Sequence, residues 1–517
     1  MKQRISLLLI LLCIGLNTSP TLFAQAKSYS TSAITSDLRF FEDWSCTRLN
    51  KNVKTRHLKE FKSPLLKQVA TELLSGRYDT TYRAVSYKAY PSNKKLSETI
   101  KLNSGFSRYE NITGMYLEKG EAVVLVGDLH GKSISLLLPD WTRKPAPGIK
   151  PTEDPEGWGL KRKEIPLHEG VNVIYIEKAG NVYVNYFDDE PESAPAVKIH
   201  FATGLVNGYF DATIHTNADW NRLLDKAISP IMDARGKYIQ VAYPVEWFKE
   251  YTNGKGVELI NSYDKMLQLQ YSLMGLVKYN KVPTNRILAR VNYNYYMFRD
   301  EDGVAYLGDK GTMRMVADPA VVVSGDPCWG FNHEVGHVMQ MSPQLTWGGM
   351  TEVSNNIFSM YVTTTLGNKS RLKEQNSYET ARKNIIEASP KKSYLMSGNP
   401  FHSLVPFWQL HLYFTQNGYP DFYGDVMEQM RNQPNAGTGN ESINNMFDFI
   451  KISCDVTKTD LTDFFDQWGF FVVGKMSIND YDHYEFNVTQ QMVDNTKSYI
   501  ASKGYPKPST DITKTIE

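Results

Sequence analysis

Two histidines four residues apart, with a glutamate directly after the first, are the residues of this sequence whose types and spacing best suit chemistry. His333 and His337 lie on one face of a helix, because one turn takes 3.6 residues, and both imidazoles can reach the same metal ion. Glu334 is rotated by about 100° from His333, so it can face a water molecule at the metal without being a ligand. The pattern therefore predicts a zinc site in which Glu334 is the general base.

The residues on either side predict the helix that this pattern requires. Asp326 is a favourable cap before Pro327, because proline is tolerated at the first helical position, and Pro343 ends the helix downstream. The His-Glu-x-x-His run then lies in the middle of a helix, where its side chains point to defined faces.

A catalytic zinc ion takes three protein ligands and keeps one position open, so the third ligand must come from another segment. The metzincin pattern would place a glycine and a third histidine where this sequence has Gln340 and Pro343, which excludes that class. A second helix is expected after Gly348-Gly349, and we take Glu352 on its polar face as the third ligand. A first-turn carboxylate that only complements the helix dipole is the alternative for Glu352.

Supporting side chains are expected around these ligands. Asn356 lies one turn beyond Glu352 and could hydrogen-bond a ligating histidine and fix its tautomer. Trp347, in the loop between the two helices, could stack on a sugar or a bound chain, with burial between the helices as the equal alternative. The donor that stabilises the oxyanion is left open among Tyr295, Tyr296, Tyr361, His402 and His411.

Hydrophobic periodicity predicts which elements position these residues. Helical spacing prevails early in the chain, and short strands separated by Gly, Pro and Asp clusters then predict a β-sandwich, or alternatively a sheet of the following domain. Strands at 237–242, 286–293 and 313–316 precede Asp326, and amphipathic helices follow it. We expect an α+β multidomain chain with five parts: a signal peptide (1–26), an N-terminal helical region (27–105), a β-sandwich (106–210), a catalytic domain with a helical C-terminal part (211–505) and a frayed tail (506–517).

The first residues predict export. Lys2 and Arg4 precede the apolar run Ile5–Leu16, and Ala24-Gln25-Ala26 offers a cleavage point, as in a secretory signal peptide. A membrane anchor is less compatible with this short run, and lipidation of Cys13 would require a small residue before it. We therefore expect a periplasmic, cell-surface or extracellular protein without a transmembrane segment after cleavage.

The composition of the chain limits the classes of molecule that it is expected to bind. The 57 Lys and Arg residues nearly balance the 56 Asp and Glu residues, so no basic field is available for nucleic acid, and we expect no such partner. The aromatic residues, 12% of the chain, suit surfaces that meet carbohydrate or peptide, and equally a tyrosine-rich core. Cys46, Cys328 and Cys454 remain after cleavage and are expected to be buried thiols, with at most one disulfide.

Two segments resemble the signature of the M60 (enhancin-like) metallopeptidases, a family of the gluzincin group: His333–Gln340, and Trp347–Tyr361. Weaker similarity at 41–46, 113–116 and 244–247 extends the resemblance over nearly the whole mature chain. The resemblance implies a gluzincin-type domain in which His333, His337 and Glu352 hold Zn²⁺ and Glu334 is the base. It also implies a substrate class, O-glycosylated, mucin-like proteins.

Three functions compete at this point. The first is a zinc endopeptidase that cleaves mucin-like O-glycosylated proteins. The second is a catalytically silent glycan-binding protein, against which the intact Glu334 speaks. The third is a general zinc peptidase without glycan dependence, which digestion before and after deglycosylation would separate from the first.

Overall fold

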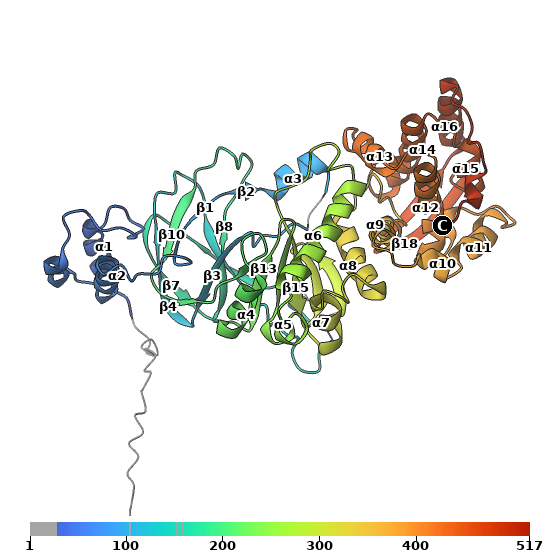
Figure 1. Cartoon of the computed structure of the whole chain (residues 1–517). Coiled ribbons are helices and arrows are strands. Elements are labelled where there is room, and N and C mark those ends of the chain that lie inside the picture. Colours follow the sequence, from blue (N-terminus) through green and yellow to red (C-terminus); the bar gives the residue numbers. More distant parts are fainter. Residues whose placement is uncertain (1–27, 103–104, 151–152, 158) are drawn as a thin grey trace, which may run out of the picture.

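The computed structural model describes residues 28–517 except 103–104, 151–152 and 158. The chain runs along an elongated molecule, from N-terminal helices through two packed sheets and a mixed α/β layer to a helical C-terminal part (Figure 1). This arrangement confirms the expected α+β fold. The predicted signal peptide, residues 1–26, lies outside the described residues.

The N-terminal helices pack on two strands of the neighbouring sheet, β4 (Gly120–Val126) and β7 (Gly170–Ile176). The continuous apolar run of β4 has two buried faces, because side chains alternate along a strand. Val123 and Leu125 pack with the helices, whereas Val124 and Val126 enter the core between the two sheets. The helices of this region are α1 (Thr31–Asp37), η1 (Leu38–Phe40), η2 (Thr55–Glu60) and α2 (Pro64–Leu74), whereas α3 (Asn93–Ile100) packs into the main core.

The stretch 27–105, which was expected to be helical, also contains strands. β1 (Ala84–Tyr87) pairs antiparallel with β10 (Val197–Phe201), and β2 (Tyr90–Pro91) pairs with β9 (Phe187–Asp188). The partners of both strands lie about 100 residues away, so local periodicity carries no sign of the pairing. Through these pairings the N-terminal region contributes strands to the sheets of the sandwich and its edge.

Two sheets pack face to face around a common apolar core, as the strand pattern predicts for a sandwich. The first has the order β1-β10-β4-β7, and the second β11-β3-β8-β5-β6. Their further strands are β3 (Asn111–Leu117), β5 (Ser135–Pro139), β6 (Arg162–Pro166), β7 (Gly170–Ile176), β8 (Gly180–Asn185) and β11 (Leu205–Val206).

A six-stranded mixed sheet of order β12-β13-β14-β15-β17-β16 precedes the metal-binding segment. Residues 313–316, predicted as a strand, instead belong to a helix, α7, because apolar Met313 and Val316 three residues apart share one helical face. The strands are β12 (Phe210–Asp211), β13 (Ile231–Arg235), β14 (Ile239–Pro244), β15 (Ile287–Asn292), β16 (Met297–Asp300) and β17 (Gly303–Leu307). The helices are α4 (Asn217–Lys226), α5 (Val245–Tyr251), α6 (Gly256–Leu273), α7 (Lys310–Ala317) and α8 (Gly325–Val338).

The C-terminal part is helical and carries one hairpin, β18 (Gly474–Asp480) and β19 (Asp482–Val488). Its larger helices are α9 (Thr351–Thr365), α12 (Pro400–Gln416), α13 (Phe422–Arg431), α14 (Asn444–Thr457) and α16 (Gln490–Lys503). Its shorter helices are α10 (Arg371–Glu374), α11 (Ser377–Ala381), η4 (Arg382–Ile386), η5 (Tyr394–Met396), η6 (Gly439–Ile443), α15 (Thr462–Gln467) and η7 (Ile512–Lys514).

The tail, residues 506–517, is not frayed as expected. Ile512 is buried, and the Gln409 side chain donates to the carbonyl oxygens of Thr513 and Thr515 at 2.8 and 3.1 Å. These contacts, together with a hydrogen bond from the Trp408 indole to the Glu517 carboxylate at 2.8 Å, hold a segment whose Pro-, Thr- and Lys-rich composition is typical of a loose end.

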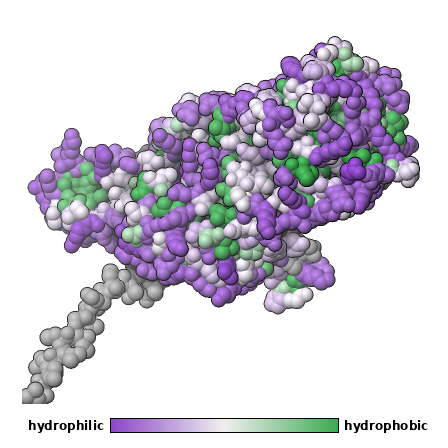
Figure 2. Space-filling model, turned by 45° about the vertical axis from the view of Figure 1, so that its right-hand side comes forward, coloured by the Kyte–Doolittle hydropathy of each residue, from purple (hydrophilic) through white to green (hydrophobic). Residues whose placement is uncertain are grey.

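Cys46, Cys328 and Cys454 are all free and buried. None of the helices in the described part of the chain combines the length and the apolar character needed to cross a membrane. On the face drawn in Figure 2 hydrophilic residues dominate, and hydrophobic residues gather in small separate patches.

Candidate metal centre

Helix α8 carries His333, Glu334 and His337, as predicted, but it begins earlier than the sequence indicates. Its first residue is Gly325 and its N-cap is Ser324, and the Asp326 carboxylate instead pairs with Arg371. Proline lacks the N–H group that is unsatisfied throughout the first helical turn, so Pro327 is compatible with several starting points and does not fix one. The expected capping role of Asp326 is therefore wrong.

Helices α8 and α9 cross closely at a glycine. A Cβ atom built on Gly336 would lie 2.5 Å from the backbone oxygen of Asn355, closer than real Cβ contacts allow. Only glycine at this position lets the two helix backbones approach this far. The crossing brings the first turns of α9 within reach of the histidines on α8.

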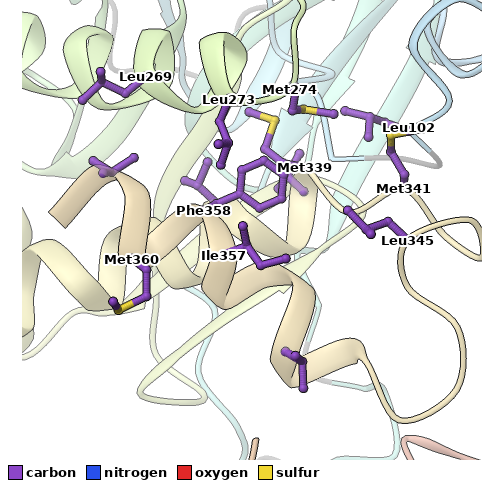
Figure 3. Close-up of a cluster of buried hydrophobic side chains, with 14 of the residues drawn as sticks. Leu102, Leu269, Leu273, Met274, Met339, Met341, Leu345, Ile357, Phe358 and Met360 are labelled. Carbon is purple, nitrogen blue, oxygen red and sulfur yellow. The ribbon is translucent and has the colours of Figure 1, made fainter. Parts of the chain in front are cut away.

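The apolar face of α9 fixes its rotation. Figure 3 shows Phe358 and Ile357 of α9 gathered with Leu273 of α6 and with Met339, the residue that follows α8. All four side chains are buried, and each fully buried side chain of this size contributes roughly 1.5–3 kcal/mol. With this face turned to α6, the polar face of α9 is turned to α8.

The side chains of His333, His337 and Glu352 converge. One potential ligand atom of each lies within 4.8 Å of the others, with His333 Nε2 3.3 Å from Glu352 Oε2 and His337 Nε2 3.6 Å from Glu352 Oε1. Tetrahedral zinc with bonds of about 2.0–2.1 Å places neighbouring ligand atoms about 3.3 Å apart. The donor set and its spacing therefore fit a zinc ion.

Two amide side chains fix the histidine tautomers. The Nδ1–H of His333 donates to Asn356 Oδ1 at 2.8 Å, and that of His337 donates to Gln340 Oε1 at 3.1 Å. A second hydrogen bond orients each amide. The amide nitrogen of Asn356 donates to the carbonyl oxygen of Glu352, and that of Gln340 donates to the carbonyl oxygen of Thr351. The Nε2 atoms then carry the lone pairs that a metal would use, and both also lie near the Asn355 amide nitrogen, at 3.3 and 3.0 Å. Asn356 lies where the sequence predicted, whereas Gln340 was considered only as a residue that breaks the metzincin pattern.

The pKa values of the two carboxyls of the site are shifted in opposite directions. Burial raises the pKa of Glu334 to about 7, with the charge of His333 opposing this shift and Glu352 adding to it. Burial also disfavours the Glu352 carboxylate, but without a metal ion the protonated rings of His333 and His337 and the Tyr481 hydroxyl lower its pKa to about 2. A general base functions best with a pKa near the working pH, and a ligand must be ionised. The environments thus suit Glu334 as base and Glu352 as ligand.

The sequence did not indicate Tyr481, which lies at the tip of the β18–β19 hairpin. Its hydroxyl donates to Glu352 Oε1 at 2.7 Å, across 129 residues of chain. A lone tyrosine in a turn carries no pattern, and its closeness to the site depends on how the hairpin packs. The residue becomes recognisable only in three dimensions.

Four of the five residues considered as oxyanion donors make ring or side-chain contacts elsewhere. The Tyr296 hydroxyl contacts Met315, His402 lies 3.1 Å from the Asn384 amide, and Tyr361 packs its ring edge-on against His411. His411 is buried and stacks on Trp408, and Tyr295 is half exposed.

Trp347 is a core residue, so of its two expected roles burial is the one observed, and contact with a glycan is not. The side chain is 1% exposed, its indole N–H donates to the Tyr394 hydroxyl at 2.9 Å, and its ring packs with Phe407 and Phe449. The loop between α8 and α9 folds inward, which buries its largest apolar side chain.

Replacing Trp347 with Ala should therefore destabilise the protein without changing substrate affinity. Removal of a fully buried tryptophan leaves a cavity and costs about 3–5 kcal/mol. Denaturant unfolding would measure the loss, and KM of the folded fraction should stay at the wild-type value. A raised KM with unchanged stability would restore the glycan-stacking role.

Comparisons with known proteins agree with this geometry. Residues 205–469, about half of the chain, match the family model of peptidase M60, enhancin and enhancin-like proteins. A metallopeptidase from Bacteroides thetaiotaomicron is 25% identical, with a TM-score of 0.79 over 95% of this chain and 82% of its own. A metallopeptidase in complex with Tn antigen is also 25% identical, with a TM-score of 0.72 over 85% of this chain and 80% of its own.

The M60 catalytic domain of Clostridium perfringens ZmpC, in complex with the sialyl T antigen, shares the fold at 18% identity, with a TM-score of 0.62 over 83% of this chain and 81% of its own. A comparison with curated proteins gives no match. The matched segment contains α8, α9 and the convergent side chains of His333, His337 and Glu352. The chain therefore belongs to the M60 family of enhancin and enhancin-like peptidases.

Proposed function

We propose that the protein is a secreted zinc endopeptidase that cleaves mucin-like O-glycosylated proteins. The observation that carries the proposal is the convergence of His333, His337 and Glu352 beside the buried Glu334. These are the three ligands and the base that hydrolysis of a peptide bond by zinc requires.

The chain supplies distinct groups for each part of the reaction. His333 and His337 would hold the ion through Nε2, and Glu352 would hold it through a carboxylate oxygen. Bound zinc supplies Lewis acidity, which polarises the scissile carbonyl and activates water. The Glu334 carboxylate accepts the proton of the attacking water and then passes it to the nitrogen of the leaving amine. Because Glu334 is only 7% exposed, this proton is held away from bulk solvent.

The substrate class is supported by a relative. The metallopeptidase in complex with Tn antigen covers 85% of this chain at 25% identity. By this similarity, we take an O-glycosylated protein as the substrate class.

A matched pair of peptides tests the proposal. One carries a single O-linked sugar on Ser or Thr, and the other is the same peptide after deglycosylation. Cleavage of the glycopeptide alone is expected, and it should stop after removal of metal with a chelator and return with zinc. Equal cleavage of both peptides would identify a general zinc peptidase, and sugar binding without cleavage by the zinc-loaded protein would identify a silent glycan-binding protein.

Export is part of the proposal. It is supported by the basic start, the apolar run and the small residues around Ala24-Gln25-Ala26. Mass measurement of the protein recovered outside the cytoplasm tests it, with a mature chain that begins near Ala26 as the expected result. Retention of Met1 in the exported protein would contradict cleavage.

A further inference from the structure

The N-terminus of α9 is capped by a residue far away in sequence. Its own N-cap residue, Met350, makes no capping hydrogen bond with its side chain. Instead, one carboxylate oxygen of Asp480, Oδ2, accepts from the N–H of Gly349 at 2.8 Å, the N–H of Thr351 at 3.0 Å and the Thr351 hydroxyl at 2.9 Å. A carboxylate at this end of a helix also complements the helix dipole.

Asp480 is also the last residue of β18 and precedes Tyr481, the single residue between the two strands. Tyr481 has a left-handed backbone conformation, with φ of 58°, and its side chain bridges back to Glu352 in the first turn of α9. The hairpin tip therefore holds this helical turn at two points, the backbone through Asp480 and the ligand carboxylate through Tyr481.

The hairpin is held in place against α9 and the loop before it (Figure 1). Met476 and Ile478 on β18 and Phe486 on β19 are buried in the main core. The ring of Tyr484 covers Gly348 so closely that a Cβ there would lie 2.5 Å from it. The sequence indicated Gly348-Gly349 only as the start of a helix. In the structure these two glycines are the surface on which the hairpin packs.

We propose that Asp480 is a positioning residue for the metal site, acting through Tyr481 on Glu352. Asp480 fixes the hairpin tip, and Tyr481 occupies one carboxylate oxygen of Glu352, which leaves the other oxygen for the metal. The proposal rests on the zinc site proposed above. It concerns how tightly the ion is held, so it can be tested without measuring peptide cleavage.

The experiment measures zinc affinity by chelator competition and thermal unfolding of the metal-free protein for full-length variants. Tyr481→Phe should weaken zinc binding by roughly 10- to 100-fold, as for other partners of metal ligands. It should leave the unfolding of the metal-free protein unchanged, because Tyr481 is 87% exposed. Tyr484→Phe, which removes a hydroxyl from the same hairpin, is the matched control and should bind zinc as the wild type does.

A double variant separates positioning from helix capping. Asp480→Ala should weaken zinc binding at least as much as Tyr481→Phe and should also lower the unfolding temperature. Adding Tyr481→Phe to it should weaken binding no further, because both changes interrupt one route. Asp480→Asn retains an acceptor oxygen and should fall between wild type and Asp480→Ala, which provides a variant if the alanine protein does not fold.

Two results would overturn the proposal. One is wild-type zinc affinity in Tyr481→Phe, and the other is multiplication of the two single fold-changes in the double variant. Failure of the wild-type protein to bind zinc would instead reject the proposed function on which this inference rests.

Discussion

Replacing Glu334 with Gln should abolish peptide cleavage while leaving one zinc ion bound per chain. The substitution keeps the size of the side chain and removes only its capacity to accept a proton, and loss of a general base costs about 100- to 10,000-fold in rate. The ligands on either side, His333 and His337, keep their Nδ1 partners and therefore their orientation. Steady-state kinetics on a glycopeptide and elemental analysis of the purified protein measure the two parts.

Glu246→Gln is the matched control for this variant. Glu246 is exposed and lies in the first turn of α5, so the same substitution there should leave both rate and zinc content unchanged. Retained turnover in Glu334→Gln would contradict the role of Glu334, and loss of zinc would show that the side chain supports the ligands instead.

The same carboxyl should also set the acid side of the pH profile. Burial raises the pKa of Glu334 to about 7, and only the ionised form can accept a proton, so kcat/KM should rise as the pH increases. A bound dication favours the carboxylate, which moves the midpoint of this rise to about pH 7 or below. In Glu334→Gln the residual rate should lose this rise, and a wild-type profile that is flat from about pH 4 to about pH 8 would contradict the assignment.

A single added methyl group at Gly336 should damage both stability and zinc binding. The new Cβ would meet the backbone oxygen of Asn355 at 2.5 Å, and neither backbone can turn away as a flexible side chain could. Overpacking of this kind costs about 1–3 kcal/mol, although alanine is the better helix former. Because α9 would be pushed from α8, Glu352 and Asn356 would both retreat from the histidines. Denaturant unfolding and chelator competition measure the two effects.

Gly330→Ala is the control on the same helix. A Cβ at Gly330 would meet only the flexible end of Met297, at 3.3 and 3.4 Å, so this variant should be neutral or slightly stabilised. Equal effects of the two substitutions would mean that helix propensity, not the close crossing, governs α8.

Local sequence patterns predicted those parts of the molecule whose structure is determined by residues close together in sequence. His333 and His337 share a helical face by spacing alone, and Glu352 and Asn356 are also one turn apart. The apolar run of β4 identified a strand with buried faces. The sequence could also separate the sandwich from the helical C-terminal part, since the period of the hydrophobic residues changes between them.

Long-range packing explains what the sequence did not predict. β1 is a strand because β10 lies beside it, Trp347 is buried because its loop folds inward, and the tail is ordered because Gln409 of α12 binds its backbone. Gln340 looked like a mere departure from another pattern until its amide met His337. Such roles depend on partners that no short window of sequence contains.

Because of the hairpin, the contacts that support the metal site extend beyond the residues that match the family model. Similarity to the M60 family model ends at residue 469, and β18 begins at Gly474. A fragment cut at that boundary would keep all three ligands and the base, yet α9 would lose the carboxylate at its N-terminus. We therefore expect a fragment cut at residue 469 to hold zinc more weakly than one that extends through β19.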